Sequence, residues 1–273
     1  MVDCGEGTQI QLRKEKISFL KISHIFISHL HGDHYFGLVG LISSMQLLGR
    51  TTDLHIYAPK EIKEIIEIQL RASTTILRYK IHYTFLETKE TELILDDKNL
   101  EVHTIPLKHK ILCNGFLFKE KPRLLKAKSE KLQYYNIPHY EIQKIKEGKD
   151  YVLPNGEVVK NEILTFPQEK SRTYAFCADT AYREKMIPII KNVDLLYLET
   201  TFLDKDQAIA KKTFHSTTFQ TGKIAKLANV SKLLIGHFSA RYTDKDYPLF
   251  LKEVKQEFEN VVVADERMTF EIS

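Results

Sequence analysis

Three histidines and one aspartate lie within six positions of the sequence, directly after a short apolar run. They form the pattern His29-Leu-His31-Gly-Asp33-His34. Imidazole nitrogens and carboxylate oxygens, without a thiolate, suit Zn²⁺ and similar divalent ions. His29 and His31 alternate, so in an extended segment they point to the same side. The glycine permits a turn, after which the aspartate and the third histidine can face a second ion. The alternative is a polar surface loop that holds these residues by chance.

Further ionisable side chains follow apolar segments elsewhere in the chain. The segments expected to be strands are 24–28, 100–105, 173–178, 194–198 and 231–235, and they are followed by His29, His109, Asp179, Glu199 and His237. In α/β folds, sites form outside the carboxyl ends of strands, so these residues should converge on one edge. A lone His109 would more often be structural, but the rest of the set favours a ligand role.

The candidate ligands are too numerous for one zinc ion. They are His29, His31, Asp33, His34, His109, Asp179 and His237. Such a set suits two ions that share a bridging carboxylate and a bridging water. Two ions about 3.5–4 Å apart can generate hydroxide and neutralise an oxyanion, which favours phosphodiester or acyl hydrolysis.

Strand and helix patterns alternate over most of the chain, which predicts an α/β fold. Helices are expected over 36–48, 60–71, 218–228 and 246–259, and further strands over 54–57, 82–86, 92–95 and 261–264. The segment 152–159 reads as a hairpin with an Asn155-Gly156 turn.

Composition indicates an ordinary globular protein, with 43% hydrophobic and 28% charged residues in a chain of 273. We expect a single domain over 1–273. The net charge of +4 permits an acidic partner without implying one. The three cysteines are widely spaced, which suggests neither a disulfide framework nor a zinc–thiolate site. The absence of a long apolar run or a signal-peptide pattern predicts a cytoplasmic protein without a membrane anchor.

Residues 119–150 differ from the rest of the chain, because basic side chains there sit among few apolar ones. Lys126, Lys128 and Lys131 lie in its first half, and several tyrosines follow. A basic run of this kind is often only a solvated face. The functional interpretation is an inserted arm that contacts RNA phosphates.

The chain resembles the metallo-β-lactamase-fold superfamily, and within it the ribonuclease Z family of endonucleases that trim the 3′ end of precursor transfer RNA. The metal-binding pattern marks the superfamily. The narrower resemblance rests on Asp3-Cys-Gly-Glu-Gly-Thr-Gln9, Gly37-Leu-Val-Gly-Leu-Ile-Ser-Ser44, Gly49-Arg50, Ala178-Asp179-Thr180, Glu199-Thr-Thr-Phe202, His215-Ser-Thr217 and Gly236-His237-Phe-Ser-Ala-Arg-Tyr242. These blocks cover nearly the whole chain.

The resemblance implies a four-layer αββα fold and a role for each site residue. His29, His31 and His109 would hold one zinc, Asp33, His34 and His237 the other, and Asp179 would bridge them. Asp33 is similar in position to the proton acceptor of the attacking water. Glu199 and His215 resemble the pair that protonates the leaving 3′ oxygen, although they could instead orient the zinc ligands. Mn²⁺ or Fe²⁺ could occupy similar ligands.

The resemblance also implies a precursor-tRNA substrate and a homodimer. Ser239, Arg241 and Tyr242 would either contact RNA phosphate or pack the last loop. Two departures accompany it. The family begins with a further strand-containing segment before Asp3, so we expect a truncated edge on the first sheet and infer a truncated or misassigned start. The 119–150 arm also lacks the Gly-Pro-rich motif common in the family.

Two other functions compete with the endoribonuclease. A small-molecule or cyclic-nucleotide phosphodiesterase would use the same metal site, and the basic arm argues against it. An inactive RNA-binding relative would have lost ligands, and none of the seven is missing.

Overall fold

The computed structural model describes residues 1–87 and 89–272, which form two compact units. The main unit comprises Met1–Asp96, Val102–Phe118 and the chain from Thr173 onward. The small unit comprises Asp97–Glu101 and Lys119–Arg172. All the candidate metal ligands belong to the main unit. No helix among the described residues is both long and apolar enough to cross a membrane.

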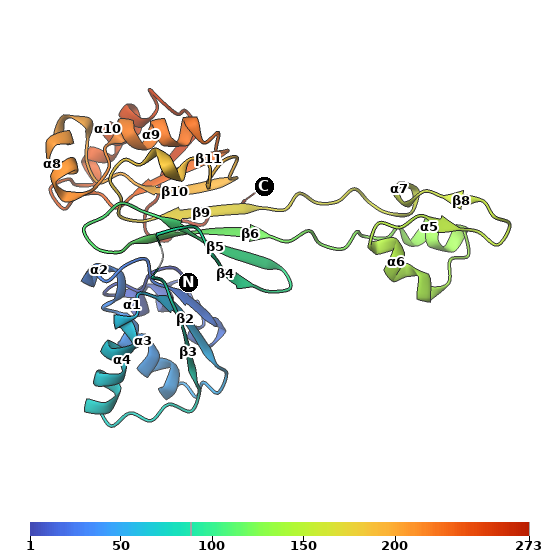
Figure 1. The fold of residues 1–273 in the computed structure, drawn as a ribbon, viewed down its shortest axis with the longest axis horizontal. Helices are drawn as coiled ribbons and strands as arrows, with labels where there is room; N and C mark the ends of the chain where they lie inside the picture. Colours follow the sequence, from blue (N-terminus) through green and yellow to red (C-terminus); the bar gives the residue numbers. More distant parts are fainter. Residues whose placement is uncertain (88, 273) are drawn as a thin grey trace. The chain divides into compact units, whose positions relative to one another are not determined.

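The first sheet of the main unit contains three parallel strands: β1 (His24–Phe26), β2 (Leu54–Ala58) and β3 (Ile81–Phe85) (Figure 1). The chain start joins the edge of this sheet, where Val2 forms a parallel bridge with Phe26. Ile25 of β1 and its partner Ile56 of β2 are buried against helices. Because side chains alternate along a strand, the residues next to them point to the opposite face of the sheet. The metal-binding pattern begins at His29, just after the carboxyl end of β1.

The second sheet has the strand order β12-β11-β10-β9-β6-β5-β4. Its strands are β4 (Leu93–Asp96), β5 (Leu100–Pro106), β6 (Asn114–Glu120), β9 (Thr173–Cys177), β10 (Leu195–Glu199), β11 (Lys232–Gly236) and β12 (Val261–Val263). β9 to β12 are parallel, so their carboxyl ends meet at one edge. Their nearly continuous apolar sequences suit strands that are covered on both faces.

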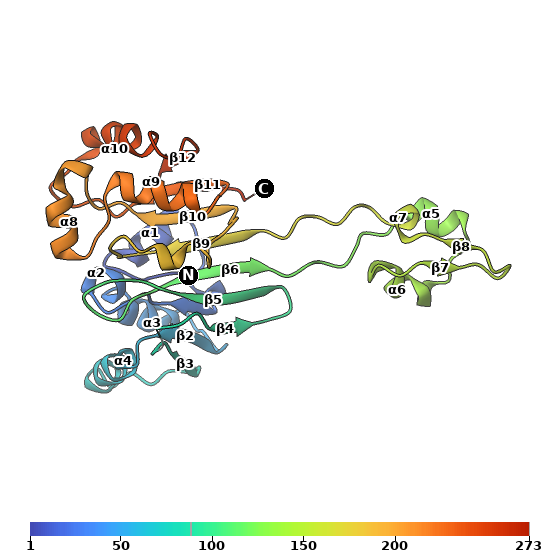
Figure 2. The same ribbon diagram turned by 45° about the horizontal axis from the view of Figure 1, so that its top comes forward.

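Helices cover the outer face of each sheet (Figure 2). α3 (Leu38–Leu47) and α4 (Glu61–Ala72) share a buried core with β1 and β2. α9 (Thr218–Leu227) and α10 (Tyr247–Val254) share another with β9 to β12. α4 is amphipathic: Ile62 and Ile66 are buried, and the positions between them are mostly charged. A capping box of Thr217 and Gln220 begins α9.

Aromatic side chains join the inner faces of the two sheets. The Phe26 ring of β1 stacks on Tyr57 of β2, with 4.5 Å between centroids. It also meets Phe116 and Phe118 of β6, at 5.3 and 5.5 Å. The layers therefore run helix, sheet, sheet, helix, which confirms the αββα prediction.

The small unit has its own core of Ile145, Val159 and Leu164. Its elements are α5 (Ser129–Tyr134), α6 (Ile142–Lys146), β7 (Tyr151–Val152), β8 (Val158–Val159) and α7 (Asn161–Leu164). The antiparallel pairing of β7 and β8 and the positive φ of 87° at Gly156 confirm the predicted hairpin.

Some predicted element bounds were wrong. The helix expected over 36–48 is α3, which begins at Leu38, and a separate short helix, α2 (Gly32–Tyr35), precedes it. The two do not join because the Gly37 N–H donates to the Cys4 carbonyl at 2.9 Å instead of continuing a helix. The last long helix ends at Val254, short of the predicted 259. The elements that were not predicted include α1 (Thr8–Lys14), β6, α8 (Gln207–Thr213) and the short helices of the small unit.

Candidate metal centre

The candidate ligands converge because each follows the carboxyl end of a strand. His29 lies in the loop after β1, and His109 follows β5. Asp179 comes two residues after β9, and His237 comes directly after β11. His237 adopts a left-handed backbone with φ of 60°, a conformation that side chains rarely adopt and that clusters at functional sites. The parallel strands thus deliver residues distant in sequence to one place.

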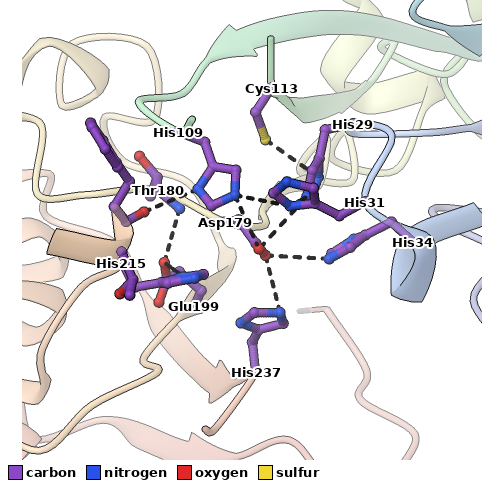
Figure 3. A network of polar contacts seen from close by, with 12 residues as sticks. His29, His31, His34, His109, Cys113, Asp179, Thr180, Glu199, His215 and His237 are labelled. Carbon is purple, nitrogen blue, oxygen red and sulfur yellow. Dashed lines mark hydrogen bonds and ion pairs between the residues drawn. The ribbon is translucent and has the colours of Figure 1, made fainter. Parts of the chain in front are cut away.

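One group of ligand atoms is formed by three imidazoles and one carboxylate oxygen (Figure 3). His31 Nδ1 lies 3.0 Å from His29 Nε2 and 3.1 Å from His109 Nε2. Asp179 Oδ2 lies 3.7 Å from both Nε2 atoms. His29 and Asp179 are buried, and His31 and His109 are half-buried.

The second group uses the other oxygen of the same aspartate. Asp179 Oδ1 lies 3.4 Å from His34 Nε2 and 3.1 Å from His237 Nε2. Asp33 Oδ2 lies 3.4 Å from the first of these nitrogens and 3.7 Å from the second. The Asp33 side chain is 66% exposed, so this group opens to solvent. Asp179 therefore stands between the two groups with one oxygen toward each.

The residues present fit two metal ions. His34 Nε2 and Asp179 Oδ1 are buried and have no hydrogen-bond partner among the described residues, a costly state unless another group satisfies them. In a tetrahedral zinc site with Zn–N bonds of about 2.0–2.1 Å, neighbouring nitrogens lie roughly 3.3 Å apart. The observed separations are close to that value, and the donors are those that zinc prefers.

Further hydrogen bonds orient the ligand rings. His34 Nδ1 lies 2.7 Å from Asp3 Oδ2, and Asp3 also accepts from the Ser28 backbone N–H at 2.7 Å. His109 Nδ1 lies 3.1 Å from the Phe214 carbonyl, and His237 Nδ1 lies 3.0 Å from Thr201 Oγ1. Such contacts fix the tautomer and leave Nε2 available to a metal.

The supporting role of Asp3 was missed from the sequence. In the sequence, Asp3 stands out only as part of a block shared with a family, and its 31-residue separation from His34 hides the contact. The sequence signal that could have revealed this role is that Asp3 is a carboxylate directly after apolar residues. The bridge between Val2 and Phe26 is what places it there.

The electrostatics of the two groups differ. Burial lowers the pKa of His29 to about 3, and burial also lowers the pKa of His109. Burial acts to lower the pKa of His34 too, but the nearby Asp179 and Asp3 carboxylates outweigh it and raise that pKa to about 10. The contact with His237 lowers the pKa of Asp33 to about 2. In the metal-free protein at neutral pH, His29 is therefore neutral and His34 is protonated.

Zinc loading of the second group should consequently depend on pH. The proton on His34 must leave before Nε2 can bind zinc, so affinity there should rise as pH climbs from 7 toward 10. With free zinc held limiting by a chelator, we expect about one zinc per chain near pH 7 and about two near pH 9, as measured by mass spectrometry of the metal.

Asp3→Asn is the matched control for this pH dependence. It keeps an acceptor oxygen for His34 but removes the charge that helps to raise the pKa of His34. Uptake of the second zinc should then shift to lower pH. Two zinc ions per chain at every pH tested would contradict the assignment.

Glu199 and His215 form a pair beside the metal ligands. His215 Nδ1 lies 2.9 Å from Glu199 Oε1, and the carboxylate is fully buried. Glu199 also accepts hydrogen bonds from the backbone N–H groups of Thr180, Thr201 and Ser216. The His215 ring is stacked 5.5 Å from that of His237. This places an oriented imidazole at the rim of the candidate metal centre.

The expected RNA contacts lie in different surroundings. In the small unit, Lys126 Nζ pairs with Glu169 at 2.5 Å, Lys128 Nζ donates to the Glu162 carbonyl at 3.1 Å, and Lys131 Nζ lies 6.0 Å from the Tyr134 ring centre. In the main unit, exposed Arg241 lies over the Phe202 ring. Tyr242 packs the last loop, with its hydroxyl 2.5 Å from Asp206 Oδ2.

The fold is that of a metallo-β-lactamase-fold protein. Solved structures agree: human tRNase Z short form covers all of this chain and 87% of its own, with a TM-score of 0.67 and 25% identity. A metallo-β-lactamase-fold protein, YhfI of Bacillus subtilis, covers 99% and 86%, with a TM-score of 0.64 and 20% identity. The family described as Anti-Pycsar protein Apyc1 matches residues 1–125.

Curated relatives narrow this class. Ribonuclease Z of Bacteroides thetaiotaomicron is 48% identical over 273 residues, which is 100% of this chain and 86% of the relative. Ribonuclease Z of Porphyromonas gingivalis strain W83 is 43% identical and covers 100% and 89%. The chain belongs to the ribonuclease Z family.

Proposed function

We propose that this protein is a zinc-dependent endoribonuclease that removes the 3′ trailer of precursor tRNA and leaves a 3′-hydroxyl on the tRNA. Membership of the ribonuclease Z family supports the reaction. The observation that carries the proposal is the arrangement of seven ligands in two groups around one carboxylate. Cleavage of a precursor tRNA by zinc-loaded protein is the experiment that tests it.

Two zinc ions held by these groups would activate water and offset the negative charge of the phosphate. Asp33 stays ionised at neutral pH, since contact with His237 lowers its pKa to about 2. Its side chain is largely exposed, so it can accept the proton of the attacking water at a carboxylate oxygen. The buried ligands behind it would hold the two ions, which would supply a fixed positive charge for the reacting phosphate.

The pair of Glu199 and His215 serves the opposite side of the reaction. The carboxylate fixes the orientation of His215 through Nδ1, so that Nε2 can donate a proton to the leaving 3′ oxygen. Backbone donors hold Glu199 from several sides, so the imidazole has one orientation. General-acid assistance of this kind contributes about 10²–10⁴-fold to a rate.

The finer parts of this proposal are the metal, the assembly and the location. The ligand set of imidazoles and carboxylates favours zinc, with Mn²⁺ or Fe²⁺ as the alternatives. The family resemblance supports a homodimer that acts in the cytoplasm.

A small-molecule or cyclic-nucleotide phosphodiesterase on the same site is the alternative function. It predicts hydrolysis of a small phosphodiester without cleavage of precursor tRNA.

The basic residues of the small unit give a prediction about substrate binding. Replacing Lys126, Lys128 and Lys131 by glutamine should raise KM for precursor tRNA several-fold, because phosphate contacts dominate affinity for nucleic acids. Lys131 should account for most of the effect, since Lys126 is already paired with Glu169. Steady-state kinetics on precursor tRNA and on a small phosphodiester would measure it. Equal losses on both substrates would contradict the arm assignment.

A further inference from the structure

Two cavities of the main unit flank the candidate metal centre. The first, of 330 Å³, is lined by His109 together with Lys108, Lys110, Arg183 and Lys89. The second, of 400 Å³, is lined by His215 together with Lys108, Lys211 and polar residues that include Gln207 and Gln220. Both volumes fall in the range of about 300–1,000 Å³ that is usual for ligand sites. Lys108 lines both cavities.

The charge of these cavities has one sign. Neither cavity has an aspartate or glutamate among its described lining residues. Within the described parts of the chain, none of the cationic side chains that line them forms an ion pair with a carboxylate. Lys126 in the small unit, by contrast, is paired with Glu169. Clustered cations without carboxylate partners repel one another, so a polyanion is the ligand that this surface fits.

Hydrogen bonds fix the cationic segment to the segment that carries Asp179. The Lys108 backbone N–H donates to Thr180 Oγ1 at 3.0 Å, and the Lys108 carbonyl accepts from the Ala181 N–H at 2.8 Å. Arg183 Nη1 donates to the Leu107 carbonyl at 3.3 Å. The cations are thus held in register with His109 and Asp179, where the scissile phosphate would lie.

We propose that these cavities bind the phosphates that flank the scissile phosphate, with Lys108 and Lys110 as the positioning residues. This inference rests on the proposed function and names contacts beside the metal centre, separate from those of the small unit. An RNA strand carries one negative charge per nucleotide, so a strand whose scissile phosphate lies at Asp179 brings the neighbouring phosphates to these cavities. Contacts to phosphate position a strand without reading its sequence.

The test compares a double variant, Lys108→Met with Lys110→Met, with Lys191→Met. Lys191 is an exposed lysine in the loop that leads into β10, at the opposite end of the strand from Glu199. Affinity for precursor tRNA is measured by filter binding in an Asp33→Ala background, and kcat and KM are measured in the active enzyme. Each is measured over a series of KCl concentrations, and zinc content is checked.

We expect the double variant to bind precursor tRNA about tenfold more weakly than the wild type. The slope of log affinity against log salt concentration should be less steep by about 1.4, because each of the two lost single-strand phosphate contacts accounts for about 0.7. The loss in kcat/KM on precursor tRNA should be much larger than on a small phosphodiester without flanking phosphates. Lys108→Arg with Lys110→Arg should restore the slope, and Lys191→Met should match the wild type.

Methylphosphonate linkages then locate the contacts. A neutral linkage beside the cleavage site should weaken binding to the wild type and have no further effect on the double variant. A double variant that matches Lys191→Met in affinity and salt slope would overturn the inference, and so would equal losses on both substrates. A zinc-loaded wild type that does not cut precursor tRNA would overturn the proposed function instead, and is a separate result.

Discussion

Asp179→Ala is expected to lower the zinc content from about two ions per chain to at most one and to reduce kcat/KM by about 10³-fold or more. The reason is that both ligand groups use this side chain, Oδ2 toward His29 and His109 and Oδ1 toward His34 and His237. Loss of the several kcal/mol that a bound metal supplies to the transition state corresponds to an effect of that size.

Controls separate the loss of metal from a loss of structure. Asp179 is buried among imidazoles. When it is removed, His34 keeps Asp3 as an acidic partner at Nδ1, so this ring stays held in place. The conservative Asp179→Asn keeps the shape but not the charge, and it should lose zinc as well. Circular dichroism should match the wild type for both variants. Two zinc ions per chain with wild-type activity would contradict a bridging role.

His215→Ala is expected to reduce kcat on precursor tRNA by about 10²–10⁴-fold with zinc content unchanged. Loss of the proton donor leaves the 3′ oxygen to depart as an alkoxide, which is a poor leaving group. A small phosphodiester with a p-nitrophenolate leaving group needs no proton, so its hydrolysis should fall far less. Parallel kinetics on the two substrates measure the difference.

The leaving-group comparison also distinguishes the two interpretations of the Glu199–His215 pair. If His215 only orients zinc ligands, both substrates should lose activity equally and zinc content should fall. The contact between the His215 and His237 rings makes that alternative physically reasonable. A loss that is independent of the leaving group would therefore contradict the proton-donor assignment.

The convergence of the candidate site could be predicted from the sequence because strand ends are readable. Each of β5, β9, β10 and β11 is an apolar run that ends near an ionisable residue, and parallel strands gather such ends at one edge. The closely spaced histidines after β1 indicated that the site binds metal ions. No comparable pattern marked the break at Gly37, because its cause is a hydrogen bond from Gly37 to the distant Cys4 carbonyl.

Other features depend on contacts that no local pattern encodes. Asp3 supports His34 only because the first residues of the chain pair with β1. Lys108 and Lys110 look like ordinary surface lysines in the sequence. Their proposed role in binding phosphate can be inferred only from the cavities that they line. The sequence pattern favours the basic run of the small unit instead, although Lys126 there is already paired with Glu169.

The most direct test of the central claim is cleavage of a precursor tRNA with a 3′ trailer by the zinc-loaded wild type beside Asp33→Ala. We predict that the wild type releases the trailer and leaves a 3′-hydroxyl on the tRNA. Asp33→Ala should be slower by about 10²–10⁴-fold, since it loses the proton acceptor along with a ligand. An intact precursor after incubation with wild type that holds two zinc ions per chain would contradict the account.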